Sequence, residues 1–235
     1  MTPGVRALLC AVLLAAAGCA PRTPPAAQLE ALAMTASQQQ SAEAEGELRL
    51  WAERGAAVAQ RELGLLYASR PARAKDSAVW LSRAARQGDA EAACAMGDSL
   101  RAPSPAAAWP WYAQAAAAGH ARAALMLGLM ARNGDGIARD PRLALRWLER
   151  AAGQGNAHAM FLLSNMLRDG EAGVADAAHA RVWLERAAEN DYPGALHELA
   201  LTVQLGDGQS PKDKLRAQHL LKEATEHRHN NWNHF

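Results

Sequence analysis

The residues Trp147–Ala152 read Trp-Leu-Glu-Arg-Ala-Ala, and the same Trp-Leu-x-Arg-Ala-Ala phrase occurs at Trp80–Ala85 and Trp183–Ala188. A looser copy begins at Trp111-Tyr112, so the later copies follow one another at a period of roughly 36 residues. Such a period is typical of stacked supersecondary units, each of which contacts only its neighbours. Ala, Leu, Arg and Glu dominate the composition, whereas the β-branched and aromatic residues that a buried sheet requires are sparse. The sequence therefore predicts an all-α array of helix pairs.

Small residues recur at fixed places and divide each unit into two helices. A glycine ends most units, and nine positions later comes a small residue that would let two helix backbones approach closely. The unit ends are Gly55, Gly88, Gly119, Gly155 and Asp191, and the small residues are Gly64, Gly97, Gly128, Ser164 and Ala200. We expect the first helices at 56–69, 89–101, 120–133, 156–169 and 193–205. We expect their partner helices at 74–87, 104–118, 140–153, 176–189 and 213–227.

One complete unit, from Ala121 to Ala157, carries Ala-x5-Leu-Gly, then Asn-Gly-Asp-Gly-Ile-Ala-Arg-Asp, then Trp-Leu-x-Arg-Ala-Ala-x-Gln-Gly-Asn-Ala. This pattern resembles the Sel1-like repeat, a relative of the tetratricopeptide repeat, and the resemblance extends over residues 55–225. It implies a right-handed α/α solenoid of about five helix pairs. Proteins with this resemblance serve as scaffolds in the cell envelope, and some act as immunity proteins. Leu220 replaces the tryptophan in the last unit, as expected of a terminal capping repeat.

The N-terminal residues 1–18 have the features of a bacterial secretory leader, with Arg6 ahead of an apolar core too short to span a bilayer. The leader ends in Ala-Ala-Gly-Cys, which resembles the lipobox of lipoproteins, so we expect Cys19 to be acylated and to anchor the chain in the membrane. An ordinary signal peptide, cut after a small residue, is the alternative. Ala20 follows the cysteine where an inner-membrane address usually has aspartate, so we expect the periplasmic face of the outer membrane.

We expect residues 19–41 to form the lipidated end and tether, in which the Ala-, Gln- and Ser-rich residues 26–41 are either helical or loose. We expect 42–227 to form the solenoid and 228–235 a polar tail rich in His and Asn. Removal of the leader leaves 24 basic and 24 acidic residues, a balance that disfavours nucleic-acid binding. It also leaves Cys94 as the one cysteine besides Cys19, which excludes an intramolecular disulfide framework.

The repeated aromatic residues could mark either a binding site or the core. Trp80, Trp111, Trp147 and Trp183 each precede an alanine by four positions on one helix face, so we interpret them as wedges in the core. His197-Glu198 begins like a zinc motif, but Leu201 occupies the place of the second ligand. We therefore expect no metal site, no cofactor and no catalytic residue, although metal binding by the tail histidines stays open.

Overlaying the units predicts a ligand groove along the first helices. One turn after the small residue, Arg101, Arg132 and Arg168 fall in register. One turn before it come Arg61, Cys94, Leu125, Phe161 and His197. Arginine binds carboxylates in bidentate fashion, so Arg61, Arg101, Arg132, Phe161, Arg168 and His197 predict a groove for an acidic or mixed acidic–apolar peptide. The alternative is that these arginines complement helix dipoles.

These observations favour a lipid-anchored periplasmic adaptor that binds a protein partner in its concave groove. An immunity protein that neutralises a secreted toxic effector is the principal alternative. A cell-envelope hydrolase is disfavoured, because the sequence offers no paired carboxylates or activated nucleophile.

Overall fold

The computed structural model describes residues 22–205 together with 218, 219, 221, 222, 224 and 225. All regular structure within this part of the chain is helical, which confirms the all-α prediction. The helices are α2 (Ala26–Gln38), α3 (Ala42–Glu53), α4 (Ala57–Ala68), α5 (Ala74–Arg86), α6 (Ala90–Arg101), α7 (Pro105–Ala117), α8 (Ala121–Asn133), α9 (Pro141–Gly153), α10 (Ala157–Asp169), α11 (Ala177–Glu189) and α12 (Pro193–Leu205), with a short 3-10 helix η1 (Pro71–Arg73) before α5. From α4 to α12 each observed end lies within one residue of the predicted one. The predicted acylation site Cys19, the tail 228–235 and most of the last partner helix lie outside the described residues.

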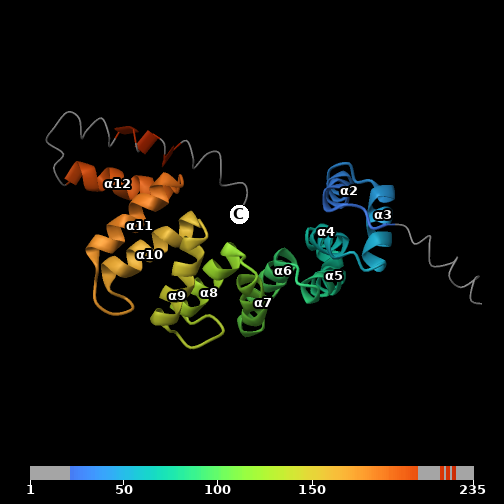
Figure 1. The fold of residues 1–235 in the computed structure, drawn as a ribbon, viewed down its shortest axis with the longest axis horizontal. Helices are drawn as coiled ribbons and strands as arrows, with labels where there is room; N and C mark the ends of the chain where they lie inside the picture. Colours follow the sequence, from blue (N-terminus) through green and yellow to red (C-terminus); the bar gives the residue numbers. More distant parts are fainter. Residues whose placement is uncertain (1–21, 206–217, 220, 223, 226–235) are drawn as a thin grey trace, which may run out of the picture.

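The helices pack in consecutive pairs, and the pairs stack into an arc (Figure 1). α4 packs on α5, α6 on α7, α8 on α9 and α10 on α11, while each pair meets the next mainly through its second helix. The first helices α4, α6 and α8 lie along the inner side of the arc, and α5, α7 and α9 form its outer side (Figure 1). Because contacts are confined to neighbouring helices, the stability of the array is close to a sum of local terms.

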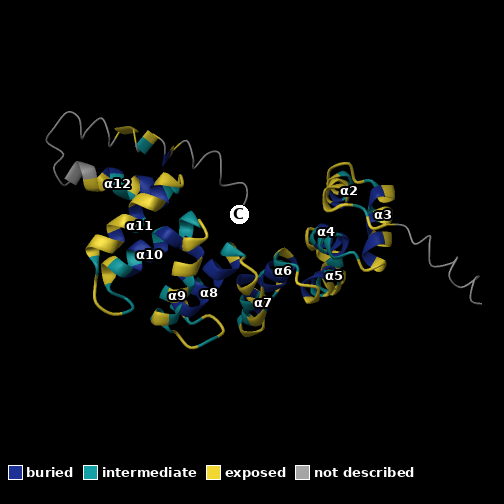
Figure 2. Cartoon of the chain, in the orientation of Figure 1, coloured by how far each residue is buried: buried dark blue, intermediate teal, exposed yellow. Residues whose placement is uncertain are grey.

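The core of each pair is a close contact between the small residue of the first helix and a large residue of the second. A Cβ at Gly64 would lie 2.7 Å from Leu81 Cγ, and one at Gly97 would lie 2.6 Å from Tyr112 Cδ1. Real Cβ atoms do not approach so closely, so glycine lets the two backbones come together. Buried residues of this kind follow the arc from α2 to α12 (Figure 2).

The tryptophans occupy a different place from the predicted one. Trp80, Trp111, Trp147 and Trp183 are half-buried at the margin of the core, and the residue after each of them fills it. Leu81, Tyr112 and Leu148 are at most 1% exposed. In three units the arginine of the repeated phrase covers the tryptophan ring, with Arg83, Arg150 and Arg186 at 4.7, 5.7 and 4.8 Å from the ring centroids. The Trp-Leu-x-Arg phrase thus combines a core leucine with a cation–π pair on the outside.

Within the described residues the first helix begins at Ala26, before the solenoid boundary expected at residue 42. Helix α2 buries Leu29, Ala33 and Ala36 against α3 and α4, so α2 and α3 form an additional pair that covers the first unit. A repeat array needs such a cover because the exposed face of its terminal pair is otherwise apolar. Among the described helices, none is both long and apolar enough to cross a membrane.

Candidate functional site

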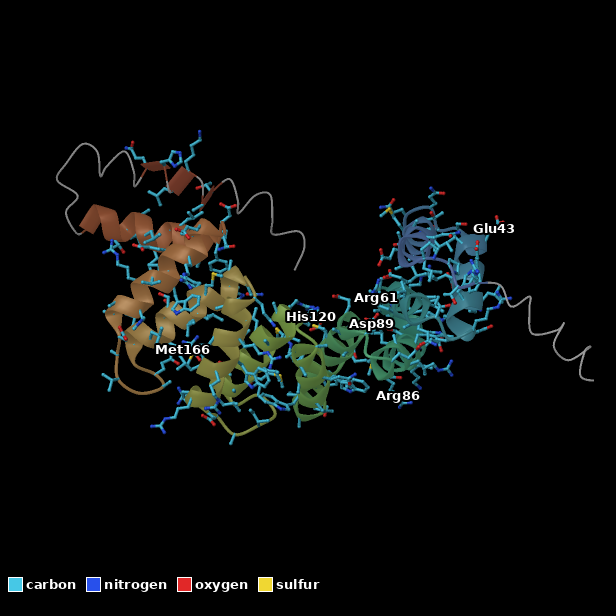
Figure 3. All side chains as sticks on the ribbon, in the orientation of Figure 1. Glu43, Arg61, Arg86, Asp89, His120 and Met166 are labelled. Carbon is cyan, nitrogen blue, oxygen red and sulfur yellow. The ribbon has the colours of Figure 1, made fainter. Side chains whose placement is uncertain are left out.

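The predicted groove residues lie on the first helices, but most of them are bound to the neighbouring unit. Arg61 on α4 shows this most clearly. Its Nη2 lies 2.7 Å from Glu30 Oε1 on α2, and its Nη1 lies 3.3 Å from Asp89 Oδ2, the N-cap of α6. Glu62 contributes a further oxygen at 2.7 Å. Arg61 therefore links three elements on the inner side of the arc, where Figure 3 shows it beside Asp89.

The arginines one turn after the small residue are paired in the same way. Arg132 donates from Nε to Glu171 Oε2 at 2.9 Å and from Nη2 to Glu171 Oε1, so the turn after α10 is held in bidentate fashion. The hydrogen bond to Glu171 is the main cause that raises the pKa of Arg132. Arg168 donates to Glu198 on α12 and to Asp169 at 3.1 Å. The predicted arginine ladder is, in these two units, a set of ion pairs between successive units.

Arg101 and His197 differ from the other predicted groove residues. Both are exposed, and within the described part of the chain neither makes an ion pair. Arg101 at the end of α6 therefore keeps its hydrogen-bonding capacity for an external group.

The residues one turn before the small residue meet the first residues of the next unit. Phe161 on α10 packs against Tyr192, with ring centroids 5.0 Å apart, and His158 stacks on the same ring at 5.2 Å. Burial lowers the pKa of His158, which keeps its imidazole neutral in this stack. Phe161 is thus a joint between units rather than an open floor for a ligand.

Cys94 lies at the equivalent joint between α6 and α8 and is completely buried. Arg122 Nη1 is 3.5 Å from its sulfur, and His120, the N-cap of α8, lies on the inner side of the arc (Figure 3). His120 Nδ1 accepts from Ala123 N at 3.2 Å, and its Nε2 is 3.0 Å from Glu91 Oε2. Sequence reasoning missed this cluster, although His120 stands where other units have the caps Asp and Asn. A substrate cannot reach the buried sulfur of Cys94. We therefore interpret these contacts as a link between the units of α6 and α8.

The described residues contain no group of three or more metal-ligating side chains, and the candidate surface is an open face. What the arrangement offers chemically is a series of hydrogen-bonding and apolar groups at repeat spacing. Such a face is suited to contact another macromolecule along several units.

The comparisons with known proteins agree with this architecture. The chain matches the Sel1 repeat model over residues 57–89, 90–120, 121–156, 157–192 and 193–229. No curated protein sequence matches it. Among solved structures, a Sel1 repeat protein from Oxalobacter formigenes is similar, with 26% identity, 86% of this chain and 88% of the other covered, and a TM-score of 0.72.

Two further structures share the fold at lower identity. A protective antigen of uropathogenic Escherichia coli has 23% identity, coverage of 86% of this chain and a TM-score of 0.71, and this chain spans 46% of that protein. An immunity protein from Pseudomonas aeruginosa has 17% identity, coverages of 88% and 84%, and a TM-score of 0.52. The Sel1 repeat model matches five successive units that together span residues 57–229, which shows that the chain belongs to the Sel1 repeat family.

Proposed function

We propose that this protein is a lipid-anchored periplasmic adaptor that binds a protein partner on the inner side of its arc. A scaffold for protein–protein interaction is what the Sel1 repeat supports. The observation that carries the choice of surface is Arg101, an exposed guanidinium on α6 without an ion pair among the described residues, on a face whose other predicted arginines are paired.

The ion pairs of Arg132 and Arg168 restrict which partner segments this face can bind. An acidic peptide would have to displace Glu171 from Arg132, and losing that bidentate pair offsets what the new pair contributes. Arg168 is 46% exposed and can exchange partners more easily. The proposed partner segment therefore carries few carboxylates, placed to reach Arg101 and Arg168.

Site-specific photo-crosslinking in the native envelope tests this proposal. A photoreactive residue at Ala102, the exposed neighbour of Arg101, should give a discrete crosslinked product, and one at Arg86, on the outer side of α5 (Figure 3), should not. The substitution Arg101→Glu should remove a product formed from a second inner-side position, while Arg86→Glu leaves it unchanged. Equal products from both positions would refute the inner side as the contact surface.

The membrane anchor is a separate part of the proposal and rests on the lipobox-like Ala-Ala-Gly-Cys segment that ends at Cys19. Metabolic labelling with palmitate should mark the natural chain and should fail for Cys19→Ser. A Cys19→Ser chain that still carries label would contradict acylation at this residue.

A second candidate is an immunity protein, as the alternative to an adaptor. The Pseudomonas aeruginosa immunity proteins have 17% and 18% identity to this chain, and that likeness is one of fold. The two functions differ in phenotype. Loss of an immunity protein leaves the cell sensitive to a toxin from its siblings, and competition between a deletion strain and its parent would reveal it. Equal survival would exclude this candidate.

A further inference from the structure

The outer side of unit three carries arginines that the repeat itself does not explain. Helix α9 contains Arg142, Arg146 and Arg150, and its one acid is Glu149. The three arginines are spaced by four residues, so they share one face of the helix, opposite the buried Leu148. Arg142 and Arg146 are exposed, and in the described chain neither makes an ion pair.

Comparison between units separates these arginines by role. Arg150 belongs to the repeated phrase and covers Trp147, as its counterparts do in two other units. The positions of Arg142 and Arg146 are held by other residues elsewhere: Lys75 and Val79 in α5, Ala106 and Pro110 in α7, and Ala178 and Val182 in α11. The solenoid is therefore built without them, and packing does not account for their presence.

An open, shallow hollow adjoins Arg142 at the turns that precede α9 and α11. It has a volume of about 460 Å³ and is lined by Arg139, Asp140, Pro141, Arg142 and the turn residues 170–173. Beside it, Val174 is 94% exposed.

In this hollow the acids are occupied and the bases are available. Asp140 Oδ1 accepts from Leu143 N at 2.9 Å as the cap of α9, and Glu171 is held by Arg132. Arg139 donates from Nε to the Arg132 carbonyl at 3.0 Å, which fixes its guanidinium at the rim. Because Glu171 is paired with Arg132, Arg139 and Arg142 outnumber Asp140 in the lining, and the hollow keeps a net positive charge.

We propose that Arg139, Arg142, Arg146 and the adjoining hollow form a second docking surface, which takes an extended acidic segment of a protein partner. The Cβ atoms of helix residues one turn apart are about 5–6 Å from each other, and alternate side chains of an extended peptide are about 6.6 Å apart. Carboxylates at every second position of such a peptide can thus pair with successive arginines. The shallow hollow beside Arg142 leaves room for a small side chain of the same peptide.

The test uses the purified full chain and a fluorescein-labelled octapeptide in which glutamate and leucine alternate, followed by fluorescence polarisation. The double substitution Arg142→Ala/Arg146→Ala should weaken binding roughly tenfold, because two charge-assisted pairs are lost. The matched control Lys75→Ala/Arg86→Ala removes the same charge from exposed positions of α5 and should change the affinity by less than about twofold. Raising the salt concentration should weaken peptide binding by the natural chain more than peptide binding by the Arg142→Ala/Arg146→Ala variant.

Three outcomes would overturn the proposal. An equal loss of peptide affinity in both double variants would indicate general attraction by net charge. Unchanged peptide binding in the Arg142→Ala/Arg146→Ala variant would exclude these arginines as the docking residues. Binding to vesicles of phosphatidylglycerol that depends on Arg142 and Arg146, without peptide binding, would assign the surface to a membrane. The proposal is independent of the inner side, because crosslinking next to Arg101 and peptide binding at α9 can succeed or fail separately.

Discussion

A double-mutant cycle between Gly128 and Leu148 tests the packing principle of the whole array. Leu148 is fully buried, and a Cβ at Gly128 would lie 2.8 Å from its Cγ and Cδ2 atoms. Gly128→Ala should gain about 1 kcal/mol of helix propensity and lose about 1–3 kcal/mol through overpacking. Leu148→Ala should cost about 2.7–5 kcal/mol, because it leaves a cavity between α8 and α9.

The combined variant should lose less free energy of unfolding than the two single variants lose together. Removing the leucine removes the clash, and the new methyl group occupies part of the vacated space. We therefore expect a favourable coupling of about 2 kcal/mol between the two substitutions.

Urea denaturation followed by circular dichroism and tryptophan fluorescence measures all four free energies of unfolding. The two probes must coincide, because repeat arrays can unfold in parts. Gly128→Ala combined with Leu81→Ala is the control, since Leu81 packs on Gly64 instead, and these effects should be additive. A coupling below about 0.5 kcal/mol between Gly128 and Leu148 would refute the reasoning.

Three further variants test the margin of the core and the ion pairs between units. Trp147→Ala should cost about 1–3 kcal/mol in urea denaturation, less than the leucine truncation, because Trp147 is half-buried and its buried Nε1 has no hydrogen-bond partner among the described residues. Arg132→Ala should destabilise the chain by about 1 kcal/mol and speed proteolysis in the turn that contains Glu171; unchanged cleavage would contradict the bidentate pair. The hydrogen bond with His120 lowers the pKa of Glu91 from its ordinary value of 4.5, so its stabilisation is present above that pH and is lost as the pH falls below it. Glu91→Gln should therefore make stability less sensitive to acid, and an identical acid profile would contradict this contact.

The helix pairs could be predicted from the sequence because their signals are local. The recurring glycines and the apolar spacing of each unit depend on residues within one turn of one another, and the observed helices match them closely. The core residue of the second helix could not be identified so well. The larger side chain of Trp147 favours it as the core residue. Leu148, the next residue, points about 100° away around the axis of α9, and only the position of α8 decides which of the two side chains faces α8.

The partners of the groove arginines depend on how units stack. Glu171 lies 39 residues from Arg132, in a turn whose path is set by the following helix pair. The sequence left the helical state of α2 undecided for a related reason. Its Ala- and Gln-rich sequence has little apolar periodicity, and its helix is stabilised by burying Leu29, Ala33 and Ala36 on helices that follow later in the chain.

In a stacked array the same register that aligns residues on a surface also brings them against the next unit. Arg132 and Arg168 fall in one register when the units are overlaid, and Arg61 falls in another. The stacking that aligns these arginines also supplies their carboxylate partners. Residues that obey the repeat are therefore explained first by the repeat. Arg142 and Arg146 depart from it on an exposed face, so an external partner accounts for them better than packing does. By this reasoning, exchanging both for the Ala and Val of α11 should leave the free energy of unfolding unchanged while it removes acidic-peptide binding. A large loss of stability would show that the two arginines serve the fold.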